Sequence, residues 1–317
     1  MKLKQIASMA LVIASLLFLP ACQSAEIPQE SGYQPITVLG VSFTEPPERV
    51  ASLSPSTTEM ILQFGLEDRL IARTDGCMLP DGIEVPSIGD GSDPDFDRIL
   101  ASRPSLVISQ NSFSKTTLDK LNQAGVKALV IPPADDLREL QSYYIALATV
   151  FFGSEEGASK AKNAMRPLVL ASNAIRIALA DSETISFVYF LKPGASAATA
   201  DTFIGNFFSC LGKNAAQGSG YQIDFAQAQE TDPSYLFLSR PYALENLMAD
   251  PGWAGFSAVQ NGNVLSFDAS LFERRNLLSL ADVLLETAKT IYPERAEEIE
   301  AVLIRLEAEA VLSEIAG

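Results

Sequence analysis

The chain has 317 residues, of which 47% are hydrophobic and 20% are charged, and its formal net charge is −16. This composition is typical of a folded globular chain with one large core or two domains, and the acidity argues against nucleic acid as a partner, because phosphate binding needs a basic surface. The absence of histidine excludes Ser-His and Cys-His nucleophilic sites, His-ligated zinc and His-ligated haem.

The chain begins with a segment that predicts a signal peptide over residues 1–21. Two lysines precede an apolar run over residues 7–19, which is too short to span a bilayer comfortably. The run ends in Leu19-Pro20-Ala21-Cys22, which resembles the lipobox of bacterial lipoproteins, where the chain is cut before a lipidated cysteine. An ordinary secretory signal with an incidental cysteine is the alternative. We expect lipidation at Cys22, followed by a polar tether and an edge strand or hairpin over residues 22–48.

Residues 49–134 predict an α/β lobe, because short apolar strands alternate with helices. Ser56 and Glu59 fit a capping box at the start of the first helix, and Gly65 fits its C-terminal end. The expected strands cover residues 50–53, 70–72, 87–90, 106–108 and 126–131, and the expected helices cover 56–64, 95–103 and 117–124.

A unit of helix, Pro-Ser pair and apolar strand occurs twice, at residues 95–108 and 224–238. In each copy the proline lies nine residues after an aspartate and is followed by serine. Proline ends a helix because it lacks an N–H group and restricts the residue before it. Two copies 129 positions apart are too few for a solenoid and suggest two lobes of similar construction with a ligand site between them.

Residues 135–181 have a helical period, which Gly153 divides and Pro167 is expected to kink. Residues 182–317 predict a second α/β lobe, with strands at 185–191 and 264–267 and helices at 201–211, 277–292 and 294–314. The expected fold class is therefore α/β, with two Rossmann-like lobes, a long rigid helix that bridges them and a ligand cleft between the lobes.

The chain resembles the iron-siderophore and vitamin B12 binding proteins that serve ABC importers. The resemblance covers residues 49–293 and rests on the segments Arg49–Glu59, Val85–Gly89, Asp97–Ile108, Trp253, Ala258–Val264 and Tyr292-Pro293. It implies a class III periplasmic-binding-protein-like fold and a lipid-anchored, extracytoplasmic protein of the bacterial cell membrane. It also implies capture of a metal chelate (iron-siderophore, haem or a cobalamin-type corrinoid) for an ABC permease. We expect a monomer that is not an enzyme and has no cofactor of its own.

The candidate ligand-binding residues follow the expected strands, because open α/β sheets bind ligands beyond the carboxyl ends of their strands. Arg274 and Arg275 are candidates to pair with a carboxylate, phosphate or catecholate, although a solvated surface pair is the alternative. An aromatic residue often stands at the position of Gly76 in the B12-binding branch, so this departure counts against a stacked corrin ring. The full set is Ser54, Ser56, Asp75, Gly76, Asn111, Tyr242, Phe272, Arg274 and Arg275.

The resemblance further implies one acidic residue on each lobe that meets arginines of the permease. Asp97 matches the first position, with Asp in place of the usual Glu. The second position falls near Ala226, so Asp224 is the nearest substitute. Stabilisation of a helix dipole is the alternative role for both acids.

Two other classes of function stay open. One is a sensor or scavenger with the same fold and no permease. The other is a carboxylate-based hydrolase that uses Asp90, Asp93 and Asp95. Cys77 and Cys210 form either two free thiols or one disulfide across the lobes, and a metal site at Cys77 and Asp75 would lack a third ligand.

Overall fold

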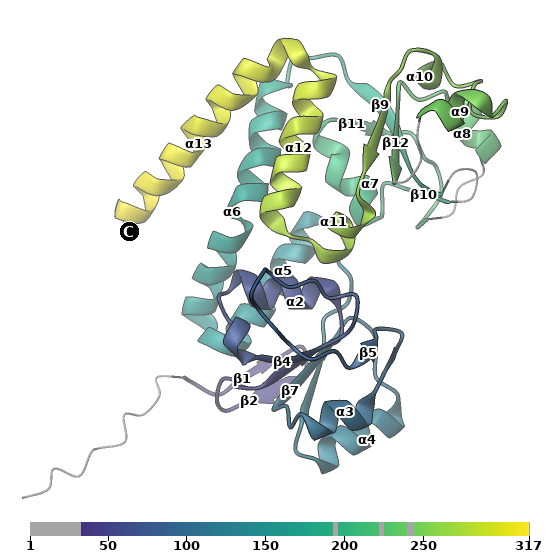
Figure 1. Ribbon diagram of the computed structural model, residues 1–317. Coiled ribbons are helices and arrows are strands. Elements are labelled where there is room, and N and C mark those ends of the chain that lie inside the picture. Colours follow the sequence, from purple (N-terminus) through teal and green to yellow (C-terminus); the bar gives the residue numbers. More distant parts are fainter. Residues whose placement is uncertain (1–32, 193–195, 222–224, 240–243, 317) are drawn as a thin grey trace, which may run out of the picture. The chain divides into compact units, whose positions relative to one another are not determined.

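The computed structural model describes residues 33–192, 196–221, 225–239 and 244–316, and Gln34–Gly317 forms one compact unit. The predicted signal peptide, Cys22, Asp224 and Tyr242 lie outside the described residues. Within them, no helix is both long and apolar enough to cross a membrane. Figure 1 shows the two main sheets, each with its own set of covering helices, and a long helix, α6 (Ser154–Ala178), that runs beside both.

The first lobe is built on a parallel four-stranded sheet of order β4-β3-β7-β8. The two central strands of this sheet are buried along their whole length, because a parallel sheet is covered on both faces. The strands are β3 (Val50–Ser52), β4 (Leu70–Arg73), β7 (Leu106–Ser109) and β8 (Lys127–Val130). The helices are α2 (Pro55–Gln63), η1 (Glu67–Arg69), α3 (Phe96–Ala101) and α4 (Lys115–Gln123).

The predicted hairpin before this lobe is confirmed, since β1 (Ile36–Val38) pairs antiparallel with β2 (Val41–Phe43). One local prediction was confirmed only in part, and another was wrong. The segment expected as a strand at 87–90 pairs with the main sheet only where Ser87 bridges Arg73, and it then forms a small hairpin of β5 (Gly89–Asp90) and β6 (Asp93–Pro94) outside that sheet. The capping box does not form, because α2 begins at Pro55, so Ser56 lies inside the helix and no side chain caps its N-terminus.

The second lobe has a sheet of order β10-β9-β12-β13, in which β11 also pairs with β9. All pairs are parallel except β9 with β10. The strands are β9 (Ile185–Lys192), β10 (Ser196–Ala198), β11 (Gly212–Asn214), β12 (Tyr235–Ser239) and β13 (Val264–Phe267). The helices are α7 (Phe203–Phe207), η2 (Phe208–Cys210), α8 (Phe225–Thr231), α9 (Leu244–Ala249), α10 (Ser257–Gln260), α11 (Ala269–Arg274), α12 (Leu277–Ile291), η3 (Pro293–Arg295) and α13 (Ala296–Ala316).

The helix expected at 201–211 is shorter, because Thr202 caps α7 and the chain then tightens into η2. Gly212 does not end a helix but begins β11. A Cβ atom at Gly212 would lie 2.4 Å from the Ile185 carbonyl oxygen, so only glycine allows β11 to approach β9 this closely.

Two helices connect the lobes, namely α5 (Leu137–Phe152) and α6 (Ser154–Ala178). Gly153, with a φ of 79°, separates them as predicted. With 25 residues, α6 is about 37 Å long at 1.5 Å per residue, and it contains Pro167. Helices α12 and α13 pack beside it, and the Arg166–Glu314 ion pair joins α6 to α13 (Figure 1). This continuous helix supports a fixed relation between the two lobes.

The described part of the duplicated unit has the same left-handed turn before its proline in both lobes. Arg103 and Asp232, directly before the two prolines, adopt left-handed φ values of 51° and 39°. The serine after each proline then forms hydrogen bonds with a residue at the neighbouring strand. Ser105 exchanges hydrogen bonds with Arg49, and Ser234 does so with Ser186. The two-lobed architecture is therefore confirmed, whereas the exact boundaries at 134 and 181 stay predictions.

Candidate ligand-binding site

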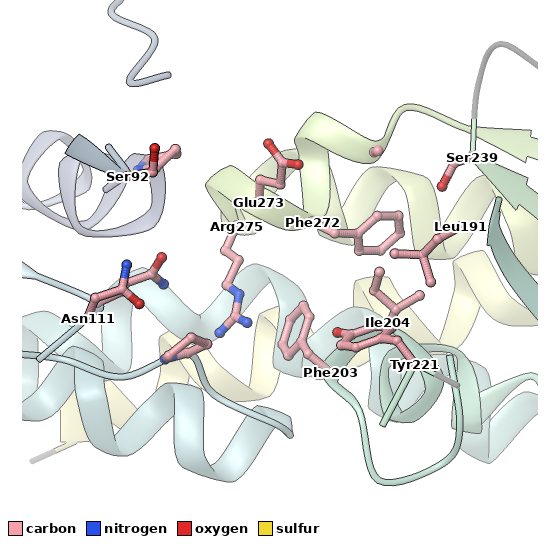
Figure 2. A pocket seen from close by; sticks show the side chains of 14 residues that line it. Ser92, Asn111, Leu191, Phe203, Ile204, Tyr221, Ser239, Phe272, Glu273 and Arg275 are labelled. Carbon is pink, nitrogen blue, oxygen red and sulfur yellow. The ribbon is translucent and has the colours of Figure 1, made fainter. Parts of the chain in front are cut away.

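A cavity of about 640 Å³ lies between the two lobes, and we call it the cleft (Figure 2). Its volume is in the range of small-molecule sites. It lies at the carboxyl ends of the strands, as Gln110 follows β7 and Ala269 follows β13 closely. The first lobe contributes Pro55, Ser92, Gln110, Asn111 and Pro133, and the second contributes Leu191, Phe203, Ile204, Tyr221, Ser239, Ala269, Phe272, Glu273 and Arg275.

The second-lobe side of the cleft is mainly apolar. Phe272 is buried, and its ring makes edge contacts with Phe207 at 5.4 Å and Tyr189 at 5.7 Å between centroids. Phe203, Ile204 and the more exposed Tyr221 extend this side, as Figure 2 shows. Aromatic rings supply large contact areas at a low entropy cost, so this side suits a flat or bulky ligand.

Arg275 is the cation of the cleft. It adopts a left-handed conformation, with a φ of 58°, directly after α11. Its side chain donates to the Ala134 carbonyl oxygen at 3.0 Å and lies 4.2 Å from the centroid of the Phe203 ring. Only 8% of the residue is exposed, and this burial lowers the pKa of the guanidinium, which nevertheless stays charged in a protein. A ligand oxygen in the cleft would therefore meet a desolvated, oriented positive charge.

The first lobe presents polar groups across the cleft from Arg275. Asn111 is exposed, and its side chain lies opposite the aromatic residues in Figure 2. Gln110 lines the cleft while its Nε2 donates to Ser56 Oγ at 2.6 Å. Ser92 completes this side from the β5–β6 hairpin. These neutral donors and acceptors fit the amide, carbonyl or hydroxyl groups at the edge of a ligand.

The structure brings Asn111, Phe272 and Arg275 together in the cleft, but not the other described candidates. Ser54 and Ser56 are buried inside the first lobe, where Ser54 Oγ bonds Thr57 Oγ1 at 2.6 Å. Ser54 directly precedes α2, but Ser56 lies inside this helix rather than in a loop, because α2 begins at Pro55.

The remaining candidates face other surroundings. Asp75 lines a separate cavity of the first lobe with Arg73 and accepts a hydrogen bond from Ser87. Gly76 is exposed beside Pro55, and a Cβ atom there would lie 3.6 Å from Pro55 Cγ, so the position has room for a side chain. Arg274 points away from the cleft to Glu59, at 3.1 Å.

Sequence reasoning missed Phe203 and Tyr221. The Thr202 cap placed Phe203 at the start of α7, and this cap is a signal that the sequence carries. Tyr221 follows a turn that Asp201 fastens. The Asp201 carboxylate accepts hydrogen bonds from Ser219 Oγ at 2.6 Å, from Thr199 Oγ1 and from the Gly220 N–H at 3.0 Å. These contacts between distant segments place Tyr221 in the cleft.

These hydrogen bonds predict an acid-dependent loss of stability. Those from Ser219, Thr199 and Gly220 hold the pKa of Asp201 at about 2, below its ordinary 3.8. Because the folded pKa is depressed, the stabilisation is present above pH 4 and is lost as the pH falls towards 2. The urea concentration at the midpoint of unfolding should fall between pH 4 and pH 2 in the wild type. We expect this fall to be smaller in Asp201→Asn. Equal falls in both proteins would contradict this role.

The other predicted groups have defined places. Asp97 is exposed in the first turn of α3, whose N-terminus Asp95 caps by accepting from the N–H groups of Asp97 and Arg98. Cys77 and Cys210 are both buried free thiols, so the disulfide does not form, and burial raises the pKa of Cys210 to about 11. Among the described residues, no group of three or more Cys, Asp or Glu side chains is arranged to hold a metal ion.

Asp90, Asp93 and Asp95 stay close in sequence but take structural roles. Hydrogen bonds from the Ser92 hydroxyl and N–H lower the pKa of Asp90, and Asp95 is the cap of α3. Asp93 pairs with Asp90 in the β5–β6 hairpin. None of these three side chains lines the cleft. The arrangement gives no support to a general acid and base facing a common substrate there.

Residues 50–271 match the model of a family described as periplasmic binding protein. The ABC transporter substrate-binding lipoprotein YvrC of Bacillus subtilis is 22% identical, over 81% of this chain and 84% of its own length. The vitamin B12-binding protein of Vibrio parahaemolyticus is 27% identical, over 73% and 84%. A periplasmic heme binding protein from Pseudomonas aeruginosa has the same fold, with a TM-score of 0.65, 21% identity and coverage of 78% and 93%. The matched segment contains both main sheets and every residue that lines the cleft except Phe272, Glu273 and Arg275, so the chain belongs to the periplasmic binding protein family.

Proposed function

We propose that this protein is the lipid-anchored substrate-binding component of an ABC importer, which captures a metal chelate and delivers it to the permease. The observation that carries the proposal is the cleft, where a buried arginine and an aromatic side lie across from neutral polar groups. Family membership supports a binding role rather than catalysis. The metal belongs to the cargo, and the protein needs no cofactor of its own.

The charges of the cleft favour a chelate of low net charge. Among its described lining residues, Arg275 is the sole cation and Glu273 the sole acid. A ferric siderophore with several negative charges would leave most of them uncompensated, and burying an unpaired charge costs several kcal/mol in order of magnitude. A macrocycle with a large apolar area and few charges fits better. We therefore rank a corrinoid or haem above a polyanionic siderophore as the ligand.

Two features bear on the choice between these macrocycles. Tyr221 offers a phenolic oxygen in the cleft, and tyrosine is one of the side chains that ligate haem iron. The amide-rich edge of a corrinoid suits the polar side chains of Asn111 and Gln110. The relatives named above include a vitamin B12-binding protein and a heme binding protein.

Delivery to the permease is tested by reversing the charge of Asp97. We expect Asp97→Lys to reduce cellular uptake by at least about tenfold, because a lysine would face the basic docking residues of a permease and like charges repel across an interface. Uptake is measured with labelled cyanocobalamin, hemin or ferric citrate, whichever the purified protein binds. Asp119→Lys is the matched control, since Asp119 is an exposed acid on α4 of the same lobe.

Ligand affinity of the purified Asp97→Lys variant should equal that of the wild type, because Asp97 does not line the cleft. Unchanged uptake together with intact binding would contradict the docking role and favour a sensor or scavenger. Turnover of the bound chelate by purified protein would instead favour a hydrolase.

A further inference from the structure

The segment Phe272–Asn276, which ends α11 and leads into α12, has two sides. Phe272, Glu273 and Arg275 line the cleft. Arg274 and Asn276, on either side of Arg275, reach across to Glu59 on α2 of the first lobe. Five consecutive residues therefore carry both the ligand side of the cleft and a polar contact between the lobes.

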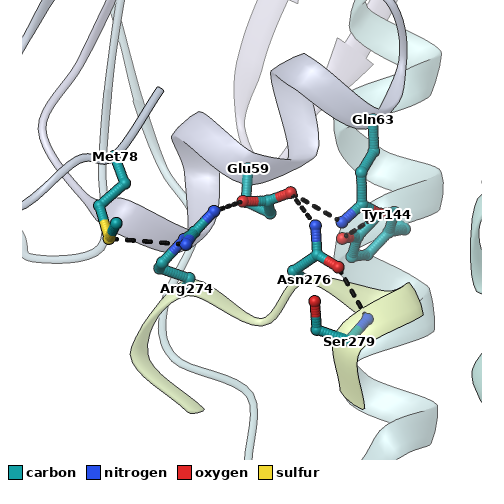
Figure 3. Close-up of polar contacts among 7 residues, drawn as sticks. All are labelled: Glu59, Gln63, Met78, Tyr144, Arg274, Asn276 and Ser279. Atoms are coloured by element: carbon teal, nitrogen blue, oxygen red, sulfur yellow. Dashed lines mark hydrogen bonds and ion pairs between the residues drawn. The ribbon is translucent and has the colours of Figure 1, made fainter. Parts of the chain in front are cut away.

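Glu59 is the centre of this contact, and only 6% of its side chain is exposed. Its carboxylate accepts hydrogen bonds from Arg274 at 3.1 Å, Asn276 at 2.5 Å and Gln63 at 3.3 Å (Figure 3). Gln63 accepts in turn from the Tyr144 hydroxyl, on α5, at 3.0 Å. We call Glu59, Gln63, Tyr144, Arg274 and Asn276 the interlobe network. It joins α2, the connecting helix α5 and the second lobe around one buried negative charge.

Arg274 and Asn276, the second-lobe residues of the network, make further contacts besides those with Glu59. Asn276 caps α12 by accepting from the Ser279 N–H at 2.8 Å, while its Nδ2 donates to Glu59. Arg274 Nη1 also lies 3.5 Å from Met78 Sδ of the first lobe. Arg275, between them, is fixed by its left-handed backbone and by the Ala134 carbonyl oxygen. A shift of Arg274 or Asn276 must therefore move Arg275 as well.

We propose that Glu59 is a positioning residue for ligand binding, which holds Arg274 and Asn276 so that the lobe spacing is set and Phe272 and Arg275 point into the cleft. The inference rests on the proposed function only in taking the cleft as the ligand site. A ligand that spans the cleft needs both sides at their correct separation. If the network is lost, the binding-competent fraction falls, and the apparent Kd rises by the inverse of that fraction.

The test combines a distance measurement without ligand and a binding measurement. Spin labels are placed at Lys115→Cys on α4 and Glu245→Cys on α9, two exposed positions in different lobes. A Cys22→Ser background removes the thiol of Cys22, and Cys77 and Cys210 are buried. Binding is measured with cyanocobalamin, hemin and ferric citrate. We expect Glu59→Gln to broaden the interlobe distance distribution and to raise the Kd of the bound probe about tenfold.

The distance measurement and the binding measurement must agree quantitatively. If a fraction f of Glu59→Gln molecules keeps the wild-type distance, the Kd should rise by about 1/f. Glu59→Asp, which retains the carboxylate, should recover part of the affinity. The matched control is Arg166→Gln, because Arg166 and Arg274 have the same exposed side-chain fraction, 27%, and Arg166 pairs with Glu314 away from the cleft. This control should change neither distance nor Kd.

An unchanged distance distribution in Glu59→Gln overturns the proposal, whether or not the Kd rises. If this variant does not fold, Glu59→Leu with Arg274→Met replaces both partners and leaves no unpaired buried charge. It should show the same broadening and the same rise in Kd. If the wild type binds none of the probes, the proposed function fails, and the distances alone decide whether Glu59 sets the lobe spacing.

Discussion

Replacing Arg275 with alanine is expected to weaken binding of hemin by about 100-fold. The guanidinium is buried, is oriented by the Ala134 carbonyl oxygen and the Phe203 ring, and is the sole cation among the described cleft residues. Removing one partner of a buried charged hydrogen bond costs about 2–5 kcal/mol, and each 1.4 kcal/mol is a factor of ten in Kd. Cyanocobalamin, which carries amides rather than carboxylates at its edge, should lose less, about tenfold.

Arg275→Lys separates charge from geometry. Both variants place a residue with a Cβ atom at the same left-handed backbone position, so their strain is alike. Lysine keeps the charge but lacks the planar group that stacks on Phe203, and we expect an intermediate Kd. Calorimetric titration of both variants checks the order. An alanine variant that folds and binds hemin as tightly as the wild type would show that Arg275 does not contact the ligand.

Replacing Phe208 with alanine is expected to lower the free energy of unfolding by about 3–5 kcal/mol. Phe208 has no exposed surface, and its ring contacts six others in the second lobe, with centroid distances between 4.8 and 6.1 Å. The six are Phe187, Tyr189, Phe207, Phe237, Phe267 and Phe272. Alanine would leave a cavity where these rings meet, and urea unfolding measures the loss.

The same substitution tests the link between core and cleft. Phe272 lines the cleft and packs on Phe208, so the cavity should also let Phe272 move and raise the ligand Kd. Phe208→Leu keeps most of the volume and should cost less than about 1.5 kcal/mol. Phe113→Ala is a control at a half-buried ring of the first lobe. A loss below about 1 kcal/mol for Phe208→Ala would contradict the role of this ring.

The sequence predicted the two-lobed fold well because its signals are local. Pro104 and Pro233 end their helices by their own chemistry, and the apolar runs after them have one way to be buried, as central parallel strands. The β5–β6 hairpin escaped prediction because Gly89–Asp90 and Asp93–Pro94 carry no apolar period. The pairing of these two short strands depends on a turn that forms only in the folded protein.

The site was only partly predictable because the side chains of residues adjacent in the sequence point in different directions. Arg274 and Arg275 look equivalent in the sequence, yet the left-handed backbone of Arg275 sends one side chain to Glu59 and the other into the cleft. Likewise, strand β11 and the Asp201 contacts decide that Tyr221 reaches the cleft. Such directions depend on contacts between distant residues, and no local pattern encodes them.

The central claim is that the cleft binds a macrocyclic metal chelate of low net charge. Calorimetric titration of the purified protein with cyanocobalamin, hemin, ferric citrate and a ferric tris-catecholate tests it most directly. Calorimetry is preferable to fluorescence, because Trp253 packs against Phe190 and Phe225 rather than lining the cleft. We expect one molecule of cyanocobalamin or hemin to bind per chain, more tightly than either anionic ferric complex. Tighter binding of ferric citrate or the tris-catecholate, or no binding of either macrocycle, would contradict the claim.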